Sequence, residues 1–217
     1  MKQYNKIDSV FKRDMNNRNH PFVIGVWSND VFGYLQDNQW TWEEKVDGTC
    51  IRIMFNGKTI TFGGKTDDAS IPSHLINKLQ EIFLPQLGLF LETFGQADDC
   101  QVCFYGEGFG RKIQEPVGSQ YLKDDVDFYL FDVKIGGRWC DRKWVASIAE
   151  SFKLPPPVVV GQGTIAEAIE LVKKGFKSNF GTADAEGLIL RTPVEMYDGK
   201  GNRIITKIKV RDFKNLN

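Results

Sequence analysis

The chain has 217 residues, of which 41% are hydrophobic and 26% are charged, a balance typical of a globular protein. Lysine plus arginine and aspartate plus glutamate number 28 each, so the formal net charge is zero, which excludes binding to nucleic acid through overall positive charge but not through a local basic groove. No run approaches the roughly 18 apolar residues of a membrane span, and the charged N-terminus lacks the apolar core of a signal peptide. The sequence therefore predicts a cytoplasmic protein without membrane contact.

Strand patterns dominate the first part of the chain. Apolar residues alternate at 22–26, 49–55 and 59–62, and an Asn-Gly pair between the last two segments is a hairpin signal. A helical period follows from residue 71 to about 94, and we expect Pro85 to divide it into two pieces.

The second half mixes strands and helices without a regular strand–helix–strand rhythm. Its predicted strands lie at 101–105, 128–133, 158–160, 188–190 and 204–210. Asp141 can cap one helix, and Thr164 with Glu167 forms a capping box for another helix that Gly175 ends. A Gly-Gly pair at 136–137 indicates a second hairpin, after the Asn-Gly hairpin at 56–57. The pattern predicts an α+β fold with mainly antiparallel sheets, in a single domain covering 1–217.

Four cysteines raise the question of a metal site. Cys100 and Cys103 form a lone C-x-x-C, but a structural zinc site needs a second pair or two histidines at matching spacing. His20 and His74 are isolated in the sequence. Reduced, partly buried thiols are the preferred interpretation.

Five short motifs occur in a fixed order. They are EKVDG at 44–48, FYGEGFG at 104–110, DFYLFDV at 127–133, AEGLIL at 185–190 and ITKIKV at 205–210. Together they resemble the covalent nucleotidyltransferase superfamily of ATP-dependent RNA ligases, DNA ligases and mRNA capping enzymes, and YGEGFGRKIQ and ITKIKVRDFK are most similar to compact phage-type RNA ligases. The resemblance implies two antiparallel sheets flanked by helices, with ATP in the cleft between them.

Lys45 is the nucleophile that this resemblance implies, with Asp47 beside it in the K-x-D-G motif. A free lysine titrates near ~10.4, so only about one molecule in a thousand is a neutral amine at pH 7. Nearby cations lower such a pKa. Lys207 and Lys209 lie two apart on a predicted strand and therefore point to the same face. They could supply this field and hold the α-phosphate.

Two further residues receive nucleotide roles from the resemblance. Glu107 is implied to accept a hydrogen bond from the ATP ribose; the alternative is an ordinary loop carboxylate. Gly106 and Gly108 on either side of it are interpreted as allowing the backbone to approach a ligand closely. Phe131 is implied to stack on adenine; the alternative is a core aromatic residue.

Two glutamates complete the implied site. Glu186 is implied to help bind the catalytic metal through water, which suits Mg²⁺, with Mn²⁺ as a substitute, because magnesium keeps several waters and takes one or two carboxylates plus substrate phosphates. Glu44 is at the position that helps to seat adenine. The alternative for Glu44 is a charge on the surface of a strand.

Three residues near the nucleophile depart from the pattern or stay ambiguous. Many relatives have Asn where this chain has Cys50 and Arg where it has Lys65, and a lysine meets a phosphate as a point charge without a bidentate fork. Lys65 is still expected to contact phosphate. Arg52 shares the strand face of Cys50, so it either faces the cleft or pairs with an acid.

The function implied is an ATP-dependent RNA ligase that joins 5′-phosphate and 3′-hydroxyl ends, in a nicked duplex or otherwise, through a lysyl-adenylate. A minimal DNA ligase is one alternative, although DNA ligases usually carry a further OB-fold domain and only eight residues follow Lys209. A capping guanylyltransferase is disfavoured for the same reason. The non-enzymatic alternative is a nucleotide- or RNA-binding module that has lost catalysis. A monomer is expected.

Overall fold

The computed structural model describes residues 3–95 and 101–214. The chain divides into two compact units. Unit 1 comprises Met1–Asn5 and Asp47–Pro157, and unit 2 comprises Lys6–Val46 and Val158–Asn217. Cys100 lies outside the described residues, so the C-x-x-C interpretation stays untested, while Cys103 and Cys140 are buried free thiols.

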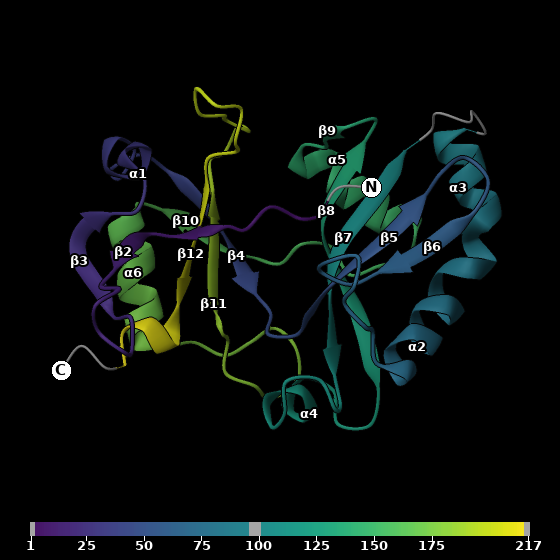
Figure 1. The fold of residues 1–217 in the computed structure, drawn as a ribbon, viewed down its shortest axis with the longest axis horizontal. Coiled ribbons are helices and arrows are strands. Elements are labelled where there is room, and N and C mark those ends of the chain that lie inside the picture. Colours follow the sequence, from purple (N-terminus) through teal and green to yellow (C-terminus); the bar gives the residue numbers. More distant parts are fainter. Residues whose placement is uncertain (1–2, 96–100, 215–217) are drawn as a thin grey trace. The chain divides into compact units, whose positions relative to one another are not determined.

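Unit 1 is built on an antiparallel sheet with the strand order β6-β5-β7-β8-β9 (Figure 1). Its strands are β5 (Thr49–Phe55), β6 (Ile60–Gly63), β7 (Val102–Gly110), β8 (Val126–Ile135) and β9 (Arg138–Trp139). Both predicted hairpins are confirmed, since β5 pairs with β6 and β8 with β9. The strands predicted from residues 101 and 128 are also confirmed, and both run several residues further than the apolar alternation indicates.

Helices cover one face of this sheet. They are α2 (Ser73–Phe83), the 3₁₀ turn η1 (Leu84–Gln86), α3 (Leu87–Phe94) and α5 (Arg142–Ser151). The short α4 (Val117–Tyr121) instead packs through Tyr121 on Phe109, near the end of β7. Pro85 lies in η1 and divides the long helical period into α2 and α3, as predicted. The predicted cap of α5 is confirmed, because the Asp141 carboxylate accepts a hydrogen bond from the Trp144 N–H at 2.8 Å.

The core of unit 1 is aromatic. Phe90 packs on Phe152 with ring centroids 4.6 Å apart, and both contact Phe104 at 5.1 Å. Alternation along β5 sends Ile51, Ile53 and Phe55 into this core, so Cys50, Arg52 and Met54 lie on the opposite face. That opposite face carries the polar residues of the motifs.

The glycines beside Glu107 make room for the core of unit 1. A Cβ on Gly106 would lie 2.2 Å from the Phe128 ring, and one on Gly108 would lie 2.5 Å from Leu75. Both positions therefore face the helices, while Glu107 between them faces the other side of the sheet. The expectation that these glycines admit a ligand is wrong in its physical reason, because their missing side chains admit buried phenylalanine and leucine.

Unit 2 contains a second five-stranded sheet with the order β1-β12-β11-β4-β10, together with a two-stranded ribbon. The strands are β1 (Asp8–Ser9), β2 (Phe11–Arg13), β3 (Phe22–Trp27), β4 (Trp40–Lys45), β10 (Val159–Gly163), β11 (Gly187–Arg191) and β12 (Ile205–Lys209). Pairing in this sheet is antiparallel except between β1 and β12, which run parallel. The α+β prediction is confirmed in both units.

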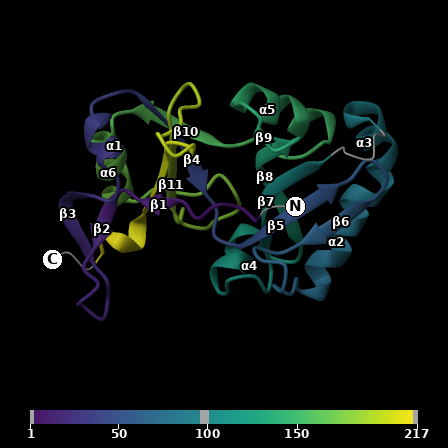
Figure 2. The same ribbon diagram turned by 45° about the horizontal axis from the view of Figure 1, so that its top comes forward.

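The core of unit 2 lies around α6 (Ile165–Lys174), which Figures 1 and 2 show between the β2–β3 ribbon and the sheet. The predicted capping box is confirmed: Thr164 and Glu167 exchange hydrogen bonds at the start of α6, and Gly175 follows its end. The short helix α1 (Asp30–Tyr34) also packs on this core through Phe32. In the described part of the chain, no helix has the length and apolarity needed to cross a membrane.

The packing of Gly106 gives a direct test of the unit 1 core. Gly106→Ala should destabilise the protein by about 1–3 kcal/mol, because its Cβ overlaps the Phe128 ring in a close-packed interior. Gly88→Ala is the matched control: Gly88 lies in α3 with open space around it, so alanine should stabilise by up to about 1 kcal/mol. Urea unfolding of both variants measures this. Equal stability of Gly106→Ala and the wild type would contradict the packing described.

Candidate active site

Lys45 is the last residue of β4, and strand alternation determines where it points. Trp40 and Trp42 enter the core beside α6, so Glu43 and Lys45 lie on the opposite face of the sheet. The Lys45 side chain is only 20% exposed. It is therefore not a freely solvated surface lysine.

A single carboxylate connects the two lysines of neighbouring strands. Gly187 in β11 pairs with Lys45 on one side and with Lys209 on the other. Glu186 directly precedes Gly187, and its carboxylate accepts from Lys45 Nζ at 2.6 Å through one oxygen and from Lys209 Nζ through the other. Burial alone would raise the pKa of Glu186, but the charges and hydrogen bonds of the two lysines outweigh it and lower that pKa.

Lys207 adds a third ammonium on the same face of β12. Its strand neighbours Thr206 and Ile208 are fully buried on the other face, which confirms that Lys207 and Lys209 point the same way. Burial, followed by the positive charges of Lys209, Lys45 and Lys6, lowers the pKa of Lys207 to about 8. Three lysines around one carboxylate leave an excess of positive charge, which is an environment for an anion.

The donor set at Glu186 suits a hard divalent cation. Magnesium and manganese accept carboxylate, phosphate and water oxygens, so one protein carboxylate can suffice when a substrate brings phosphates. Glu186 is ionised and faces the lysine cluster. Within residues 3–95 and 101–214 no cluster of three or more His, Cys, Asp or Glu side chains forms a metal cage. The rest of a metal's ligands would be phosphate and water.

Glu44 lies on the side of β4 opposite to Lys45. Its carboxylate accepts hydrogen bonds from the Ser178 hydroxyl, from the Asn179 N–H at 2.9 Å and from Asn179 Nδ2 at 2.8 Å. The side chain anchors the loop after α6, and Glu44 is only 2% exposed. The interpretation of Glu44 as a surface charge is wrong. Its proposed contact with adenine stays a prediction.

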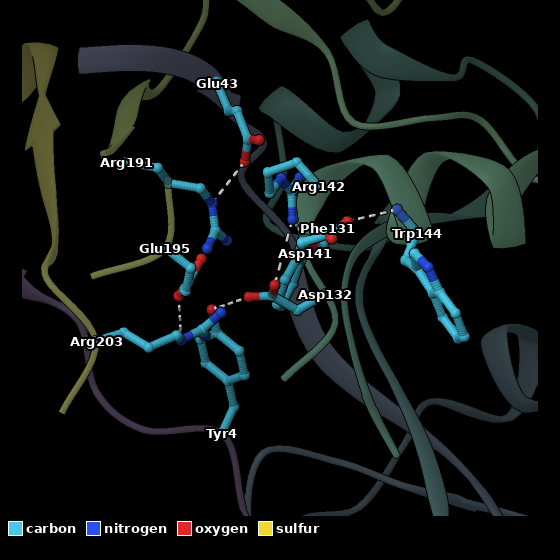
Figure 3. A network of polar contacts seen from close by, with 10 residues as sticks. All are labelled: Tyr4, Glu43, Phe131, Asp132, Asp141, Arg142, Trp144, Arg191, Glu195 and Arg203. Carbon is cyan, nitrogen blue, oxygen red and sulfur yellow. Dashed lines mark hydrogen bonds and ion pairs between the residues drawn. The ribbon is translucent and has the colours of Figure 1, made fainter. Parts of the chain in front are cut away.

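Sequence reasoning missed a buried ion pair on the Lys45 face. Arg191 Nε donates to Glu43 at 2.9 Å, and both side chains are 4% exposed (Figure 3). The available signal was period two: Glu43 stands two residues before Lys45 on one strand, so the two share a face. Removing one partner of such a pair would leave a buried charge, which is strongly destabilising.

In unit 1, Glu107 and Cys50 lie side by side on neighbouring strands. The two are register partners between β7 and β5, and Lys65 is close enough to act on the Cys50 thiol electrostatically. Burial, with the charge of Glu107, raises the pKa of Cys50 to about 12, so the thiol stays neutral. Glu107 and Lys65, two of the residues predicted to contact the nucleotide, thus both act on the Cys50 thiol electrostatically.

Arg52 fixes the loop that carries Lys65. Its Nε donates to the Gly64 carbonyl oxygen at 2.7 Å, and its guanidinium pairs with Asp67 at 2.8 Å. Arg52 is 1% exposed, so it pairs with an acid and does not face open solvent. This decides between the two alternatives left by the sequence. Lys65 itself is exposed.

Asp47 and Phe131 occupy structured positions in unit 1. The Asp47 backbone N–H donates to the Tyr121 hydroxyl at 3.2 Å, which holds the start of the Asp-Gly turn. Phe131 lies in β8 where the register with β7 shifts, and it is partly exposed. It is therefore not one of the fully buried core phenylalanines.

The predicted site residues divide between the units. Unit 2 brings Lys45, Glu186, Lys207 and Lys209 into one cluster, and unit 1 carries Asp47, Lys65, Glu107 and Phe131. A groove of about 1040 Å³ in unit 2 is lined by α6 and residues 210–214 and contains none of these side chains. Positive charge converges at the lysine cluster around Glu186 instead.

The profile of the RNA ligase family matches residues 38–209. No curated protein sequence matches the chain.

Solved structures with this fold include several of an RNA ligase from Naegleria gruberi. One variant with ATP and manganese has a TM-score of 0.63 at 13% identity and covers 86% of this chain and 54% of its own. An apo variant has a TM-score of 0.65 at 12% identity, covering 99% and 59%. A third, with AMP and manganese, has a TM-score of 0.60 at 14% identity, covering 83% and 52%. The chain thus spans a little more than half the length of these ligases. Since the family profile covers most of its residues, the chain belongs to the RNA ligase family.

Proposed function

We propose that this protein is an ATP-dependent RNA ligase that works through a lysyl-adenylate on Lys45. The observation that carries the proposal is the Lys45–Glu186–Lys209 arrangement, with Lys207 beside it. A lysine held at one place within a positive cluster is the arrangement expected of an amine that attacks a phosphate. The RNA ligase family match and the ATP-bound and AMP-bound Naegleria structures support the same chemistry.

The first step transfers AMP to the protein. The nitrogen of neutral Lys45 forms a bond to the α-phosphorus of ATP, the bond from that phosphorus to the bridging oxygen breaks, pyrophosphate leaves, and the surplus proton on nitrogen passes to solvent. Lys45 pairs with Glu186, so this contact must break before the nitrogen can attack. Lys207 and Lys209 stabilise the charge that develops on the phosphate oxygens.

The next two steps act on RNA ends. An oxygen of the 5′-phosphate forms a bond to the adenylate phosphorus, the bond from that phosphorus to Lys45 breaks, and the leaving nitrogen takes up a proton from solvent to restore the amine. The 3′-hydroxyl of the other end then attacks the activated 5′-phosphate, its proton passes to solvent, and AMP leaves as the new phosphodiester forms. Glu186 would hold a divalent metal together with phosphate and water oxygens, and that metal would supply positive charge to offset the charge of the triphosphate.

Unit 1 supplies the proposed contacts to the rest of the nucleotide. Glu107 accepts from the ribose, Phe131 stacks on adenine and Lys65 contacts a phosphate. The buried Arg52 supports Lys65 by fixing its loop. Asp47, two residues after the nucleophile, is proposed to take part in catalysis. Glu44 is proposed to help seat the adenine. Residues 1–217 then work as one adenylation domain, monomeric and in the cytoplasm.

Two other functions make different predictions. A DNA ligase shares the same first step and differs only in the ends that it joins. A binding module without catalysis would bind ATP and form no covalent bond. The intact lysine cluster around Glu186 favours an enzyme, because a module has no need of a partly desolvated lysine trio.

Covalent labelling tests the proposal. Wild-type protein incubated with α-labelled ATP and magnesium should retain label through denaturing electrophoresis. Lys45→Ala and Lys45→Arg should both lose it, since arginine keeps the charge but is not a nucleophile. Lys12→Ala, at an exposed lysine in β2, is the matched control and should label fully. Full labelling of Lys45→Ala would exclude Lys45 as the nucleophile, and an unlabelled wild type would favour the binding module.

Lys207 should lower the free energy of unfolding even though it contributes to the proposed adenylylation. Its pKa is depressed from 10.5 to about 8, so between these values the unfolded chain binds more protons and stability rises with pH; below pH 8 the full cost is present. Lys207→Met should therefore raise the Tm at pH 7 by roughly 2–4 °C while weakening adenylylation. This gain should shrink as the pH rises from about 8 towards 10.5. Calorimetry at several pH values measures it.

Lys209→Met provides the contrast. It removes one partner of the buried Glu186 carboxylate, so it should lower the Tm at pH 7. A lower Tm for Lys207→Met at pH 7, or a difference that does not change with pH, would contradict the charge balance described for the cluster.

The exposed positive charges of the protein bear on which RNA ends it should join fastest. Lys65, Arg111, Lys112, Arg211 and Lys214 are all exposed, and such side chains grip phosphates without reading bases. A nicked duplex presents both ends already aligned, which lowers the entropic cost of joining them. We expect faster sealing of a nick with RNA on the 3′-hydroxyl side than of an unsplinted single strand, with a steep loss at higher salt.

The measurement compares sealing rates on three substrates under one set of conditions. They are a nicked RNA duplex, the same nick with a DNA strand on the 3′-hydroxyl side, and an unsplinted RNA strand. Equal or faster joining of the unsplinted strand would reject the nick preference. Indifference between RNA and DNA at the 3′-hydroxyl would support the DNA-ligase alternative.

A further inference from the structure

Phe131 stands at a point where the sheet does not fix its side chain. In the register between β7 and β8, Tyr105 pairs with Asp132 and Gly106 pairs with Leu130, so Phe131 is the extra residue of a β-bulge. A bulged residue has no partner across the ladder, and bulges commonly redirect a side chain beside a functional site. Some other contact must therefore set the direction of the Phe131 ring.

Asp132 and Arg142 hold the backbone at the bulge. The Asp132 side chain is fully buried, and Arg142, the first residue of α5, lies 3.3 Å from its carboxylate. The same Arg142 nitrogen donates to the Phe131 carbonyl oxygen at 2.7 Å (Figure 3). A buried carboxylate requires such partners, so this part of β8 has a fixed path.

Tyr4 adds the contact to the ring itself. Its hydroxyl donates to Asp132 at 2.5 Å, as Figure 3 shows, and its ring meets Phe131 edge-on with centroids 5.0 Å apart. The same ring also contacts Tyr105 at 5.2 Å and Trp139 at 5.5 Å. Edge-to-face pairs at these separations attract beyond the area they bury.

The contacts of Tyr4 also explain a division of the chain. Met1–Asn5 belong to unit 1, although the residues that follow belong to unit 2. Gln3 and Asn5 are exposed, while Tyr4 between them is half-buried against four residues of unit 1. Among the described residues 3–5, Tyr4 is thus the side chain that anchors the segment to unit 1.

We propose that Tyr4 is a positioning residue for the nucleotide base. It holds the Phe131 ring through edge contact and through the Asp132 hydrogen bond, so that one ring face is presented in a fixed direction to adenine. This inference rests on the proposed function, because it assigns a role to Tyr4 in the ATP site. Tyr4 itself need not touch the nucleotide. The contrasting role is a plug, in which Tyr4 occupies the space that the base needs.

The test is the KM for ATP in the adenylylation step, measured alongside kcat. Tyr4→Ala should raise the KM about tenfold, corresponding to roughly 1.4 kcal/mol, while kcat at saturating ATP changes less than about twofold. Tyr4→Phe keeps the ring and loses the hydroxyl, so its KM should rise less. Tyr34→Ala is the matched control, because Tyr34 is 87% exposed and its removal should leave the KM unchanged.

A double mutant separates positioning from general stability. If Tyr4 acts through Phe131, then adding Tyr4→Ala to Phe131→Ala should raise the KM no further than Phe131→Ala alone. A lower KM in Tyr4→Ala would identify the plug and overturn the proposal. An unchanged KM with a lower Tm would show a purely structural residue and overturn it as well. Additive effects in the double mutant would show that Tyr4 does not act through Phe131.

The outcome for the wild type distinguishes this inference from the proposed function. If the wild type takes no AMP label, both the ligase mechanism and the nucleotide role of Tyr4 are rejected. If the wild type labels normally but Tyr4→Ala keeps its KM, only the role of Tyr4 is rejected.

Discussion

The candidate site depends on the two ion pairs that the Glu186 carboxylate forms with Lys45 and Lys209. Strands β4 and β12 flank β11 on its two sides. Glu186, directly before β11, pairs with one lysine of each flanking strand. Gly187 allows this closeness, since a Cβ there would lie 2.0 Å from the Ile208 carbonyl oxygen. Without the carboxylate, three ammonium groups would face one another in a partly desolvated place. The carboxylate thus offsets the repulsion among the lysines of the cluster.

Strand alternation explains how one short sheet can serve both packing and chemistry. On β4, Trp40 and Trp42 face the core while Glu43 and Lys45 face the other side; on β12, Thr206 and Ile208 alternate with the two lysines. The apolar face fixes the register, because a slip by one residue would bury the lysines and expose the core. The depressed pKa of Lys207 shows that this arrangement costs stability. Such a cost is expected where function requires a charge to be partly desolvated.

Local signals were predictable from the sequence, and long-range partnerships were not. The capping box at Thr164, the break at Pro85 and strand β5 each follow from a few neighbouring residues, and the structure confirms them. The motif order likewise indicated the family. By contrast, Glu43 meets Arg191 across 148 positions and Tyr4 meets Asp132 across 128, and no periodicity links such pairs. The burial of Glu44 and the packing role of the glycines beside Glu107 also depend on which residues fold over them.

The central claim is that Lys45 carries AMP as a covalent intermediate, and locating the adduct tests it most directly. Protein incubated with ATP and magnesium, then digested and analysed by tandem mass spectrometry, should show one AMP group on the peptide that contains Lys45, with fragment ions that place it on that side chain. Added pyrophosphate should reverse the modification. AMP on Lys207 or Lys209 instead, or no AMP on any peptide under conditions where ATP binds, would contradict the account.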